Sequence, residues 1–480
     1  MDPRTPVDAR YLQIAQGLAE AMRQGGLARG QRLPSVRETA RQHGVAVTTA
    51  VQAYRWLEDE QLIEARPRSG FFVRGRSATV LPEPTVARSA RRPQPVRVDD
   101  VLGRRLLGPV HDSGVVSFSS GTPAASLLDA DRVRRTLVRT VQRQRALLCQ
   151  YPGADGHPEA RQALARYALS LGCSLDPARI TITAGCMEAI SLCLRTVTRP
   201  GDVVAIESPT HYSFLELLQS LHLQALEIPT HPRHGLSLDA LQLALDTQPV
   251  KALVLVPTLS NPLGSCMPLA ERRRLAEMAS RHDLAVVEDA VYNDLVLHDE
   301  LRRTVKSFDR SGHVMLCDSF SKTVAPGLRL GWVEAGRWTD ALRRLKSVQG
   351  AQTAVLELAL ADLLGQAGHQ AAMRQLRHGG AQRLDLARGL IAESFPAGTR
   401  VSDPPGGFLL WVELPPGLDG QAVHEAAQAE GILVAPGRLF SGQARFRHCL
   451  RIGVGADWGP AHPAALRRVG ELACGLLTRR

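Results

Sequence analysis

The stretch CDSFSKTVAPGLRLGWV, residues 317–333, contains the residues on which the interpretation of this chain depends. It includes Lys322, and lysine is rare here, because only four of the 58 basic residues are lysine. An apolar run at 314–318 precedes it and predicts a buried strand, and the proline and glycines that follow are typical of a loop. Serine hydroxyls and the guanidinium of Arg329 flank the lysine. This setting favours a chemical role for Lys322 over that of a solvated surface residue.

The sequence around this stretch alternates between short apolar runs and helical segments. The apolar runs are residues 180–183, 203–207, 252–257, 284–288 and 314–318. This alternation is typical of a mainly parallel sheet covered by helices, the α/β class. In such sheets ligands gather beyond the carboxyl ends of the strands. Residues that follow these runs are therefore the candidates for a binding site.

Residues 317–333 resemble the lysine segment of fold-type I enzymes that depend on pyridoxal 5′-phosphate (PLP). Those enzymes bind the cofactor aldehyde as a Schiff base, the internal aldimine, on one lysine. The resemblance implies that role for Lys322 and assigns Ser319 and Arg329 to the cofactor phosphate. It also implies an aminotransferase-like domain over residues 113–480, with a small C-terminal α+β subdomain from about 385 to 480.

Other positions match the same family in the expected order. Asp289 corresponds to the carboxylate that pairs with the protonated pyridine nitrogen, although a helix cap is the alternative. Asn261 and Tyr292 resemble the pair that bonds the phenolic oxygen of the cofactor. The dipeptide formed by Asn261 and Pro262 is also compatible with an ordinary turn.

The predicted phosphate loop joins a strand to a helix at Gly185, Cys186 and Met187. Backbone amides at a helix N-terminus can cradle phosphate, and only this backbone contribution is expected, because the family more often has serine and glutamine after the glycine. In ESPTHYSF, Tyr212 or His211 is expected to stack on the pyridine ring, and Tyr212 is preferred.

Two further residues are assigned through the resemblance. Tyr151, in YPGADGHPEAR, corresponds to the tyrosine that reaches the phosphate of the neighbouring subunit, which implies a homodimer. Arg451, in CLRIGVGA, corresponds to the arginine that binds a substrate α-carboxylate, with a surface arginine at a strand edge as the alternative. The chain departs from the family after Gly121-Thr122-Pro123, where the usual aromatic segment is replaced by LLDADRVRR. This places the identity of the substrate or effector in question.

The first 75 residues have a different pattern, which predicts helix, helix, turn, helix and β-hairpin. A serine and a glutamate at positions 35 and 38 form a capping box that starts the second helix. Two β runs, 62–65 and 70–73, end the region. This order is that of a winged helix-turn-helix.

The stretch RLPSVRETARQHGVAVTTAVQAYRWLEDEQLIEARPRSGFFV resembles the GntR family of bacterial DNA-binding domains. The third helix would enter the major groove, where Thr48, Thr49 and Gln52 would reach base edges. Helix capping is the alternative role of the two threonines. The family usually has Ser-Arg at positions 46 and 47, so an unusual operator preference is expected. The residues expected to meet phosphates or the minor groove are Arg32, Ser35, Arg37, Arg66 and Arg68.

Charge supports the same division of the chain. The net charge is +11 and the pI about 9.7. Residues 1–75 carry 11 basic and 8 acidic residues, a net charge of +3. Residues 76–110 carry 7 basic and 3 acidic residues, a net charge of +4. A basic N-terminal quarter suggests nucleic acid, although a solvated arginine-rich surface accounts for the charge equally well. The proline- and arginine-rich span 76–112 is predicted to be a flexible or partly extended linker.

The predicted order of domains resembles the MocR subfamily of bacterial regulators. It consists of a winged helix over 7–75, a linker over 76–112 and an aminotransferase-like domain over 113–480. The resemblance implies a PLP-dependent DNA-binding transcriptional regulator that senses an amino-acid or amine effector and binds double-stranded DNA. One alternative is an active aminotransferase with an accessory DNA-binding domain. The other is a plain repressor whose C-terminal domain only dimerises, which the full set of PLP residues disfavours.

Composition excludes several other classes of protein. The 480 residues are 44% hydrophobic and 22% charged, which is a globular composition. No apolar run reaches membrane-spanning length, and the N-terminus lacks the apolar core of a secretory signal. The eight cysteines form no C-x-x-C pair, so no zinc ribbon, metal site or disulfide framework is expected. The expected location is the cytoplasm, in association with the nucleoid.

Overall fold

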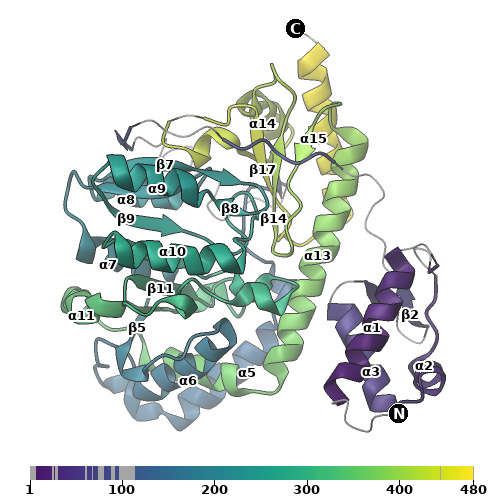
Figure 1. Ribbon diagram of the computed structural model, residues 1–480, viewed down its shortest axis with the longest axis horizontal. Helices are drawn as coiled ribbons and strands as arrows, with labels where there is room; N and C mark the ends of the chain where they lie inside the picture. The colour runs from purple at the N-terminus through teal and green to yellow at the C-terminus, as the bar shows by residue number, and fades with distance from the viewer. Residues whose placement is uncertain are drawn as a thin grey trace. The chain divides into compact units, whose positions relative to one another are not determined.

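The computed structural model describes residues 7–23, 26–27, 31–59, 62–66, 69–73, 81–87, 92–96, 114–443 and 445–478. The chain divides into two compact units, Met1–Val80 and Leu81–Arg480. Figure 1 shows the elements of both units. No helix among the described residues is long and apolar enough to cross a membrane.

The N-terminal unit is a winged helix-turn-helix, as the sequence predicts. Its elements are α1 (Val7–Arg23), α2 (Val36–Gln42), α3 (Val47–Asp59) and the antiparallel strands β1 (Ile63–Arg66) and β2 (Gly70–Val73). Ser35 caps α2, accepting a hydrogen bond from the amide of Glu38 at 3.2 Å. Tyr54 is buried in the small core and donates to the carbonyl of Pro34 at 2.6 Å, which fixes α3 against the start of α2.

The larger unit is built on a mainly parallel sheet, which confirms the predicted fold class. In spatial order its main strands are β3 (Gln94–Pro95), β7 (Gln224–His231), β6 (Val203–Ser208), β9 (Val250–Leu255), β10 (Ala285–Asp289), β11 (Val314–Ser319), β12 (Gly331–Glu334) and β5 (Ile180–Thr183). Strands β7, β6, β9, β10 and β11 are parallel neighbours. Strand β12 runs antiparallel between β11 and β5, and β3 pairs antiparallel with β7.

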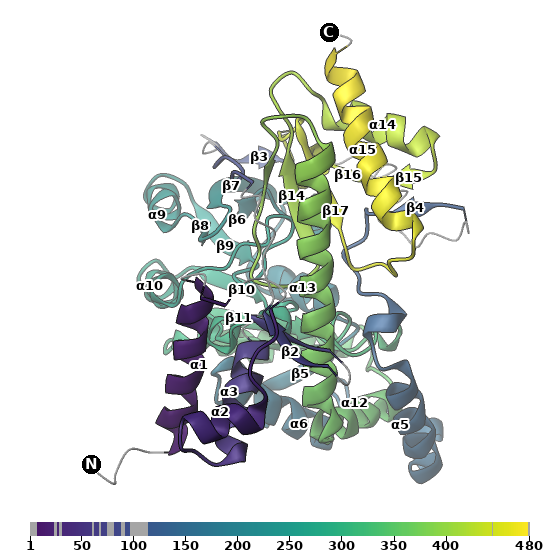
Figure 2. The ribbon, with the colours of Figure 1, turned by 90° about the vertical axis from the view of Figure 1, so that its right-hand side faces the viewer.

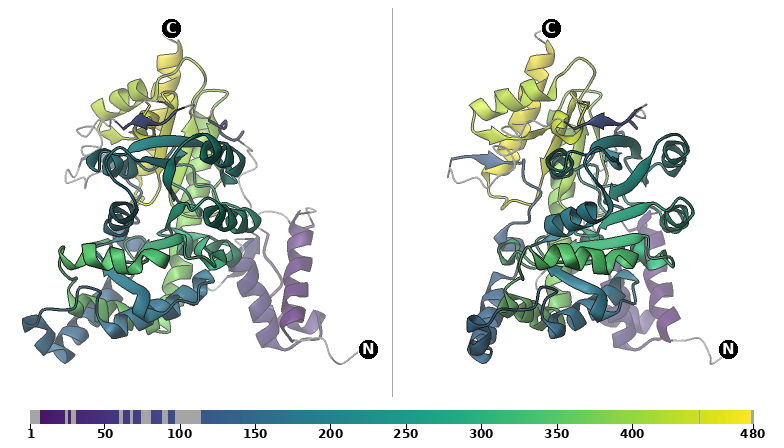
Figure 3. Two further views of the ribbon diagram at one scale, coloured as in Figure 1. Left: turned by 60° about the vertical axis from the view of Figure 1, so that its left-hand side comes forward. Right: turned by 90° about the vertical axis from the view of Figure 1, so that its left-hand side faces the viewer.

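Helices cover both faces of this sheet, because alternate strand residues supply apolar side chains to either side. On one face β6 and β9 pack with α7 (Cys186–Val197) and α8 (Tyr212–Ser220). On the other face they pack with α9 (Leu238–Thr247) and α10 (Leu269–Arg281). Figure 3 shows these layers from two sides. The other helices before the C-terminal subdomain are α5 (Ala130–Arg143), α6 (Pro158–Ala168), α11 (Thr339–Ser347), α12 (Ala354–Gly365) and α13 (Gly368–Ser394).

A smaller C-terminal subdomain follows α13, the long helix that runs toward it in Figure 2. Its antiparallel sheet has the order β13 (Arg400–Val401), β14 (Leu409–Glu413), β17 (Cys449–Gly453) and β16 (Ala435–Pro436). Helices α14 (Gly420–Ala429) and α15 (Ala461–Thr478) pack with it. A separate parallel pair joins β15 (Ile432–Leu433) to β4 (Val116–Ser117), so the start of the aminotransferase-like region is part of this subdomain.

Within the span predicted to be a linker, residues 81–87 and 92–96 are described and belong to the larger unit. The amide of Thr85 donates to the carboxylate of Glu413 at 2.6 Å, and β3 lies at the edge of the large sheet. Residues 97–113 lie outside the described residues.

Candidate functional site

Most of the predicted cofactor residues come together beyond the carboxyl ends of the parallel strands. Asp289 is the last residue of β10, and Ser319 is the last residue of β11. Gly185 follows β5 and precedes α7. Asn261 follows β9, and Arg451 lies on β17 of the C-terminal subdomain. The site is therefore built between the large sheet and that subdomain.

Lys322 lies in the turn after β11, with its ammonium group turned toward the C-terminal subdomain. Its Nζ donates to Oγ1 of Thr122 at 3.0 Å. Burial and the positive charge of Arg451 lower the pKa of Lys322 to about 8, and Asp289 opposes this shift. A lysine with such a pKa is partly a neutral amine near neutral pH, which is the form that attacks a carbonyl carbon.

Asp289 is held by one of its two carboxylate oxygens. Oδ1 accepts from the amide of Val291 at 3.0 Å and from the thiol of Cys186 at 3.2 Å. The side chain is 6% exposed, and burial raises the pKa of Asp289 to about 6. The carboxylate is therefore charged at neutral pH, and Oδ2 has no hydrogen bond among the described residues. The sequence predicted only a backbone role for Cys186, so the contact of its thiol with Asp289 is an addition.

Gly185 and Arg329 form a narrow cradle at the N-terminus of α7. Gly185 has φ +95°, and a Cβ at that position would lie 2.9 Å from Nη2 of Arg329. Gly331 packs against the backbone of Gly185, because a Cβ at position 331 would lie 2.5 Å from the carbonyl carbon of Gly185. The guanidinium of Arg329 donates to the carbonyl of Ala184 at 3.0 Å. Ser319 is buried beside this turn. A helix N-terminus, a guanidinium and hydroxyl groups are suited to a phosphate dianion.

Asn261 links Tyr292 to Arg451. Its Nδ2 donates to the hydroxyl of Tyr292 at 3.3 Å, and its Oδ1 accepts from Nη1 of Arg451 at 3.1 Å. Arg451 also donates to the carbonyl of Ser119 and lies over the ring of Phe440, 4.9 Å from its centroid. Its Nε is buried without a partner among the described residues, and burial lowers the pKa of Arg451 to about 10. An arginine buried in this way is not the surface arginine considered as an alternative.

The remaining predicted residues differ in position. His211 and Tyr212 begin α8, and their rings lie 5.0 Å apart, so both remain candidates for ring stacking. Burial, with Arg451 and Lys322 nearby, lowers the pKa of His211 to about 3, so this imidazole is neutral. Met187 is only partly buried. Tyr151 is fully exposed, at 105% of its reference area, and contributes nothing to the site within one chain.

The predicted DNA-contacting residues lie in the N-terminal unit. Thr48 and Gln52 are exposed near the start of α3, whereas Thr49 is 6% exposed. Burial leaves Thr49 little access to a base edge, so Thr48 and Gln52 are the stronger candidates. Arg32, Ser35 and Arg37 are exposed. The side chain of Arg66, and the whole of Arg68, lie outside the described residues.

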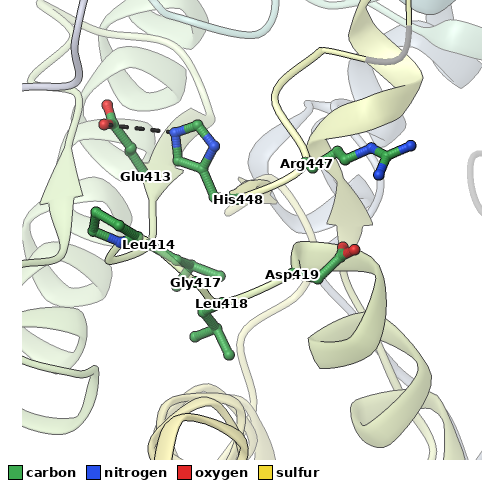
Figure 4. Close-up of a pocket in the computed structure, with 8 residues that line it drawn as sticks. Glu413, Leu414, Gly417, Leu418, Asp419, Arg447 and His448 are labelled. Carbon is green, nitrogen blue, oxygen red and sulfur yellow. Dashed lines mark ion pairs between the residues drawn. The ribbon is translucent and has the colours of Figure 1, made fainter. Parts of the chain in front are cut away.

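A hollow of about 440 Å³ lies elsewhere on the C-terminal subdomain, and Figure 4 shows the residues that line it. Glu413 and His448 face each other there, with 3.7 Å between the carboxylate and Nε2. None of the predicted cofactor residues lines this hollow, so it is not the candidate site.

The residues gathered beyond the carboxyl ends of the parallel strands fit PLP. Lys322 supplies an amine, Asp289 a carboxylate with one oxygen uncommitted, and the turn between Gly185 and Arg329 a cradle that a Cβ would fill. The unpartnered Nε of Arg451 marks a place for an acceptor group. Fold and site together define a domain of the fold-type I class, whose cofactor is PLP, on the same chain as a winged helix-turn-helix.

Comparison with known proteins agrees with this class. Residues 113–458 match the family "Aminotransferase class I and II", and residues 10–73 match "Bacterial regulatory proteins, gntR family". The chain is 38% identical to the HTH-type transcriptional regulator YjiR of Escherichia coli, over 96% of this chain and 98% of that protein. It is 26% identical to the probable rhizopine catabolism regulatory protein MocR of Rhizobium meliloti, over 89% and 86% of the two chains.

A solved structure gives the same result for the larger unit. The multiple substrate aminotransferase of Thermococcus profundus superposes with a TM-score of 0.73 at 26% identity, covering 80% of this chain and 96% of that one. The chain therefore belongs to the MocR subfamily of GntR-type transcriptional regulators, which join a GntR domain to an aminotransferase class I and II domain.

Proposed function

We propose that this regulator binds PLP covalently through Lys322 and that an amino compound, by displacing the lysine, changes its binding to DNA. The observation that carries the proposal is that Lys322 and Asp289, at the carboxyl ends of strands of the large sheet, meet Arg451 of the C-terminal subdomain. Each has a pKa shifted by burial, to about 8, about 6 and about 10 respectively. Titratable groups with shifted pKa values in one site are typical of chemical function.

Each residue has a distinct task in this proposal. When bound, PLP supplies an electrophilic carbon and an electron-withdrawing ring. Lys322 provides the nucleophilic amine. Asp289 keeps the ring nitrogen protonated through its Oδ2, and Tyr292 with Asn261 bonds the phenolic oxygen. The phosphate is held by the amides that start α7, at Gly185, Cys186 and Met187, and by Ser319 and Arg329.

The ligand side of the site requires an amine and favours a carboxylate. An amine is required because only an amine nitrogen can replace Nζ of Lys322. A carboxylate is favoured because Arg451 presents a buried guanidinium with an unpartnered Nε. Its planar donors suit bidentate binding of a carboxylate. Tyr212 or His211 would cover the ring, and His211 is neutral there.

The N-terminal unit would bind double-stranded DNA, as expected of its family. Thr48 and Gln52, exposed on α3, would read base edges, and Arg32, Ser35 and Arg37 would contact phosphates. A homodimer would supply two such units, and the fully exposed Tyr151 would reach the phosphate site of the partner subunit. Its location would be the cytoplasm, at the nucleoid.

A working aminotransferase is the second candidate function. It is favoured by the same residues, because Lys322, Asp289 and Arg451 would also serve transamination. Conversion of an amino acid to a keto acid by the purified protein, lost in Lys322→Ala, would support it. A repressor that uses the larger unit only for dimerisation would need neither a lysine with a lowered pKa nor an uncommitted carboxylate.

The proposal is tested by the absorbance of the purified protein with PLP. A visible band should appear, and a panel of amino acids and amines should alter it. Lys322→Ala should lose the band while its far-ultraviolet circular dichroism remains that of the wild type. A band that survives in Lys322→Ala would overturn the assignment of the lysine.

A further inference from the structure

The contact between Lys322 and Thr122 joins two parts of the molecule that are far apart in sequence. Lys322 lies in the turn that follows β11 of the large sheet. Its Nζ donates to Oγ1 of Thr122 at 3.0 Å, and no other hydrogen bond of Nζ is found among the described residues. Both side chains are half-buried. Thr122 was not among the residues predicted for the site.

Thr122 is carried by a segment, residues 116–124, that is bound along its length to the C-terminal subdomain. Strand β4 pairs in parallel with β15 at the start of the segment. The hydrogen bonds that continue this attachment are Phe118 N to Leu433 O at 2.8 Å, Gly453 N to Phe118 O at 2.6 Å, Arg451 Nη2 to Ser119 O, and Ala124 N to Gly455 O at 2.8 Å. The segment is therefore expected to move with that subdomain.

The backbones of the two parts are in unusually close contact. A Cβ at Gly453 would lie 1.9 Å from the carbonyl oxygen of Ser120, and one at Gly455 would lie 2.5 Å from that of Thr122. Only glycine permits this approach. Because the backbone of Thr122 is held so tightly, its hydroxyl is a fixed partner for Lys322.

The chain that leads to the DNA-binding unit is attached to the same subdomain. The amide and hydroxyl of Thr85 donate to the carboxylate of Glu413, at 2.6 and 3.0 Å. The amide of Val401 donates to the carbonyl of Pro82 at 2.9 Å. Strands β13 and β14 thus hold residues 81–87, and Figure 4 shows Glu413 beside His448 at this place. A displacement of the subdomain would move this part of the chain.

We propose that Thr122 is the acceptor that holds Nζ of Lys322 when the lysine is not attached to the cofactor, and that release of the lysine is transmitted to the C-terminal subdomain through this bond. The inference rests on the proposed function. In the release step an incoming primary amine forms a C–N bond to the cofactor carbon, and the C–N bond to Lys322 breaks. The lysine leaves as a free amine that carries the two hydrogens lost by the incoming nitrogen.

The hydrogen count explains why this bond would report on release. Attached to the cofactor, Nζ has at most one hydrogen and lies within a conjugated system. Released, it has two or three hydrogens and can donate to Thr122 as it does in this structure. The bond would therefore favour the released state and make displacement by an amine easier.

The test compares Thr122→Val, which keeps the shape but lacks the hydroxyl, with Thr122→Ser, which keeps the hydroxyl. Ser126→Ala is the matched control, because it removes a hydroxyl from the same region that bonds Asp457 and not Lys322. Each PLP-loaded protein is titrated with methylamine, whose lack of a carboxylate makes its binding independent of Arg451. The absorbance of the bound cofactor measures displacement, and a separate titration with PLP measures cofactor affinity.

Thr122→Val should need about three- to tenfold more methylamine for half-displacement, the range that one hydrogen bond supplies. Its affinity for PLP should equal or exceed that of the wild type. The cofactor-free protein, in which Lys322 is unattached, would no longer be stabilised by the hydrogen bond from Nζ to residue 122. Thr122→Ser and Ser126→Ala should behave like the wild type. Unchanged displacement in Thr122→Val, or weaker PLP binding in that variant, would overturn the inference while leaving the proposed function intact. A wild type without any cofactor band would overturn both.

Discussion

Replacing Asp289 with asparagine removes the charge that is expected to hold the cofactor ring and keeps the size of the side chain. Oδ1 of Asp289 is bonded by the amide of Val291 and the thiol of Cys186, at 3.0 and 3.2 Å. An asparagine can place its carbonyl oxygen at the same position. The substitution therefore changes mainly the group at Oδ2, which is assigned to the protonated ring nitrogen.

The expected loss follows from burial. Asp289 is 6% exposed, so water compensates poorly for a missing charge. Removing one member of a buried ion pair costs about 3–5 kcal/mol. Each 1.4 kcal/mol is a factor of ten, so PLP affinity should fall by about a hundredfold to a few thousandfold in D289N.

The assay is a titration of the cofactor-free protein with PLP, followed by absorbance at neutral pH. D283N is the control, because Asp283 is 73% exposed and is not among the site residues. It should bind PLP like the wild type. If D289N, with unchanged circular dichroism, also binds PLP like the wild type, the ion pair assigned to Asp289 is refuted.

The pH dependence provides a second measurement on the same variants. Burial raises the pKa of Asp289 to about 6 in the cofactor-free protein. A protonated ring nitrogen beside the carboxylate favours its ionised form, so PLP and a proton compete for the same group. Wild-type affinity should therefore fall as the pH drops below about 6, and that of D289N should not show this fall.

Three further predictions concern other residues. Burial lowers the pKa of Lys322 from 10.5 to about 8, so at neutral pH folding buries a charge, and Lys322→Met should raise the melting temperature of the cofactor-free protein. This gain in melting temperature should shrink as the pH rises from about 8 past 10.5, because the lysine then becomes neutral in the unfolded as well as the folded protein. A gain that stays constant in thermal melts across that pH range would contradict the lowered pKa of Lys322. Cys186→Ala should weaken PLP binding several-fold and Cys186→Ser should not, because only serine restores a donor to Asp289; equal effects in a PLP titration would argue against that contact. Gln52→Ala should cost about 1–3 kcal/mol at the cognate DNA site and relax its sequence preference, whereas Arg37→Ala should weaken all sequences and reduce the salt slope by about one, as binding titrations at several salt concentrations would show.

Most of the parallel strands could be predicted because each consists largely of apolar residues. The run at 180–183 is β5, and that at 314–318 differs from β11 by one residue. Strand β7 was missed because Glu227, at its centre, breaks the apolar pattern. That carboxylate is buried, and it accepts from the hydroxyls of Ser208 and Ser441, both at 2.7 Å. Partners so distant in sequence leave no local signal.

The site shows the same limit. Lys322, Asp289 and Gly185 could be predicted because each lies at the end of a strand, or within three residues of it, in a recognisable motif. The thiol contact of Cys186 and the hydroxyl contact of Thr122 depend on which elements are neighbours in space. Pairing of β4 with β15 brings Thr122 to the lysine, and no pattern near residue 122 predicts that pairing.

A regulator and an aminotransferase place opposite demands on the released state of Lys322. An enzyme needs the lysine to return in every cycle, because the amino-acid product of the second half-reaction would leave when the lysine reattaches to the cofactor. A sensor needs the released state to persist while its ligand is present, and allosteric coupling of about 1–3 kcal/mol is typical. One hydrogen bond contributes about 0.5–1.5 kcal/mol, so the proposed role of the bond to Thr122 would by itself supply a coupling in the lower part of that range. The lifetime of the displaced state is therefore the property that separates the two functions, and Thr122 is the residue through which this chain would lengthen it.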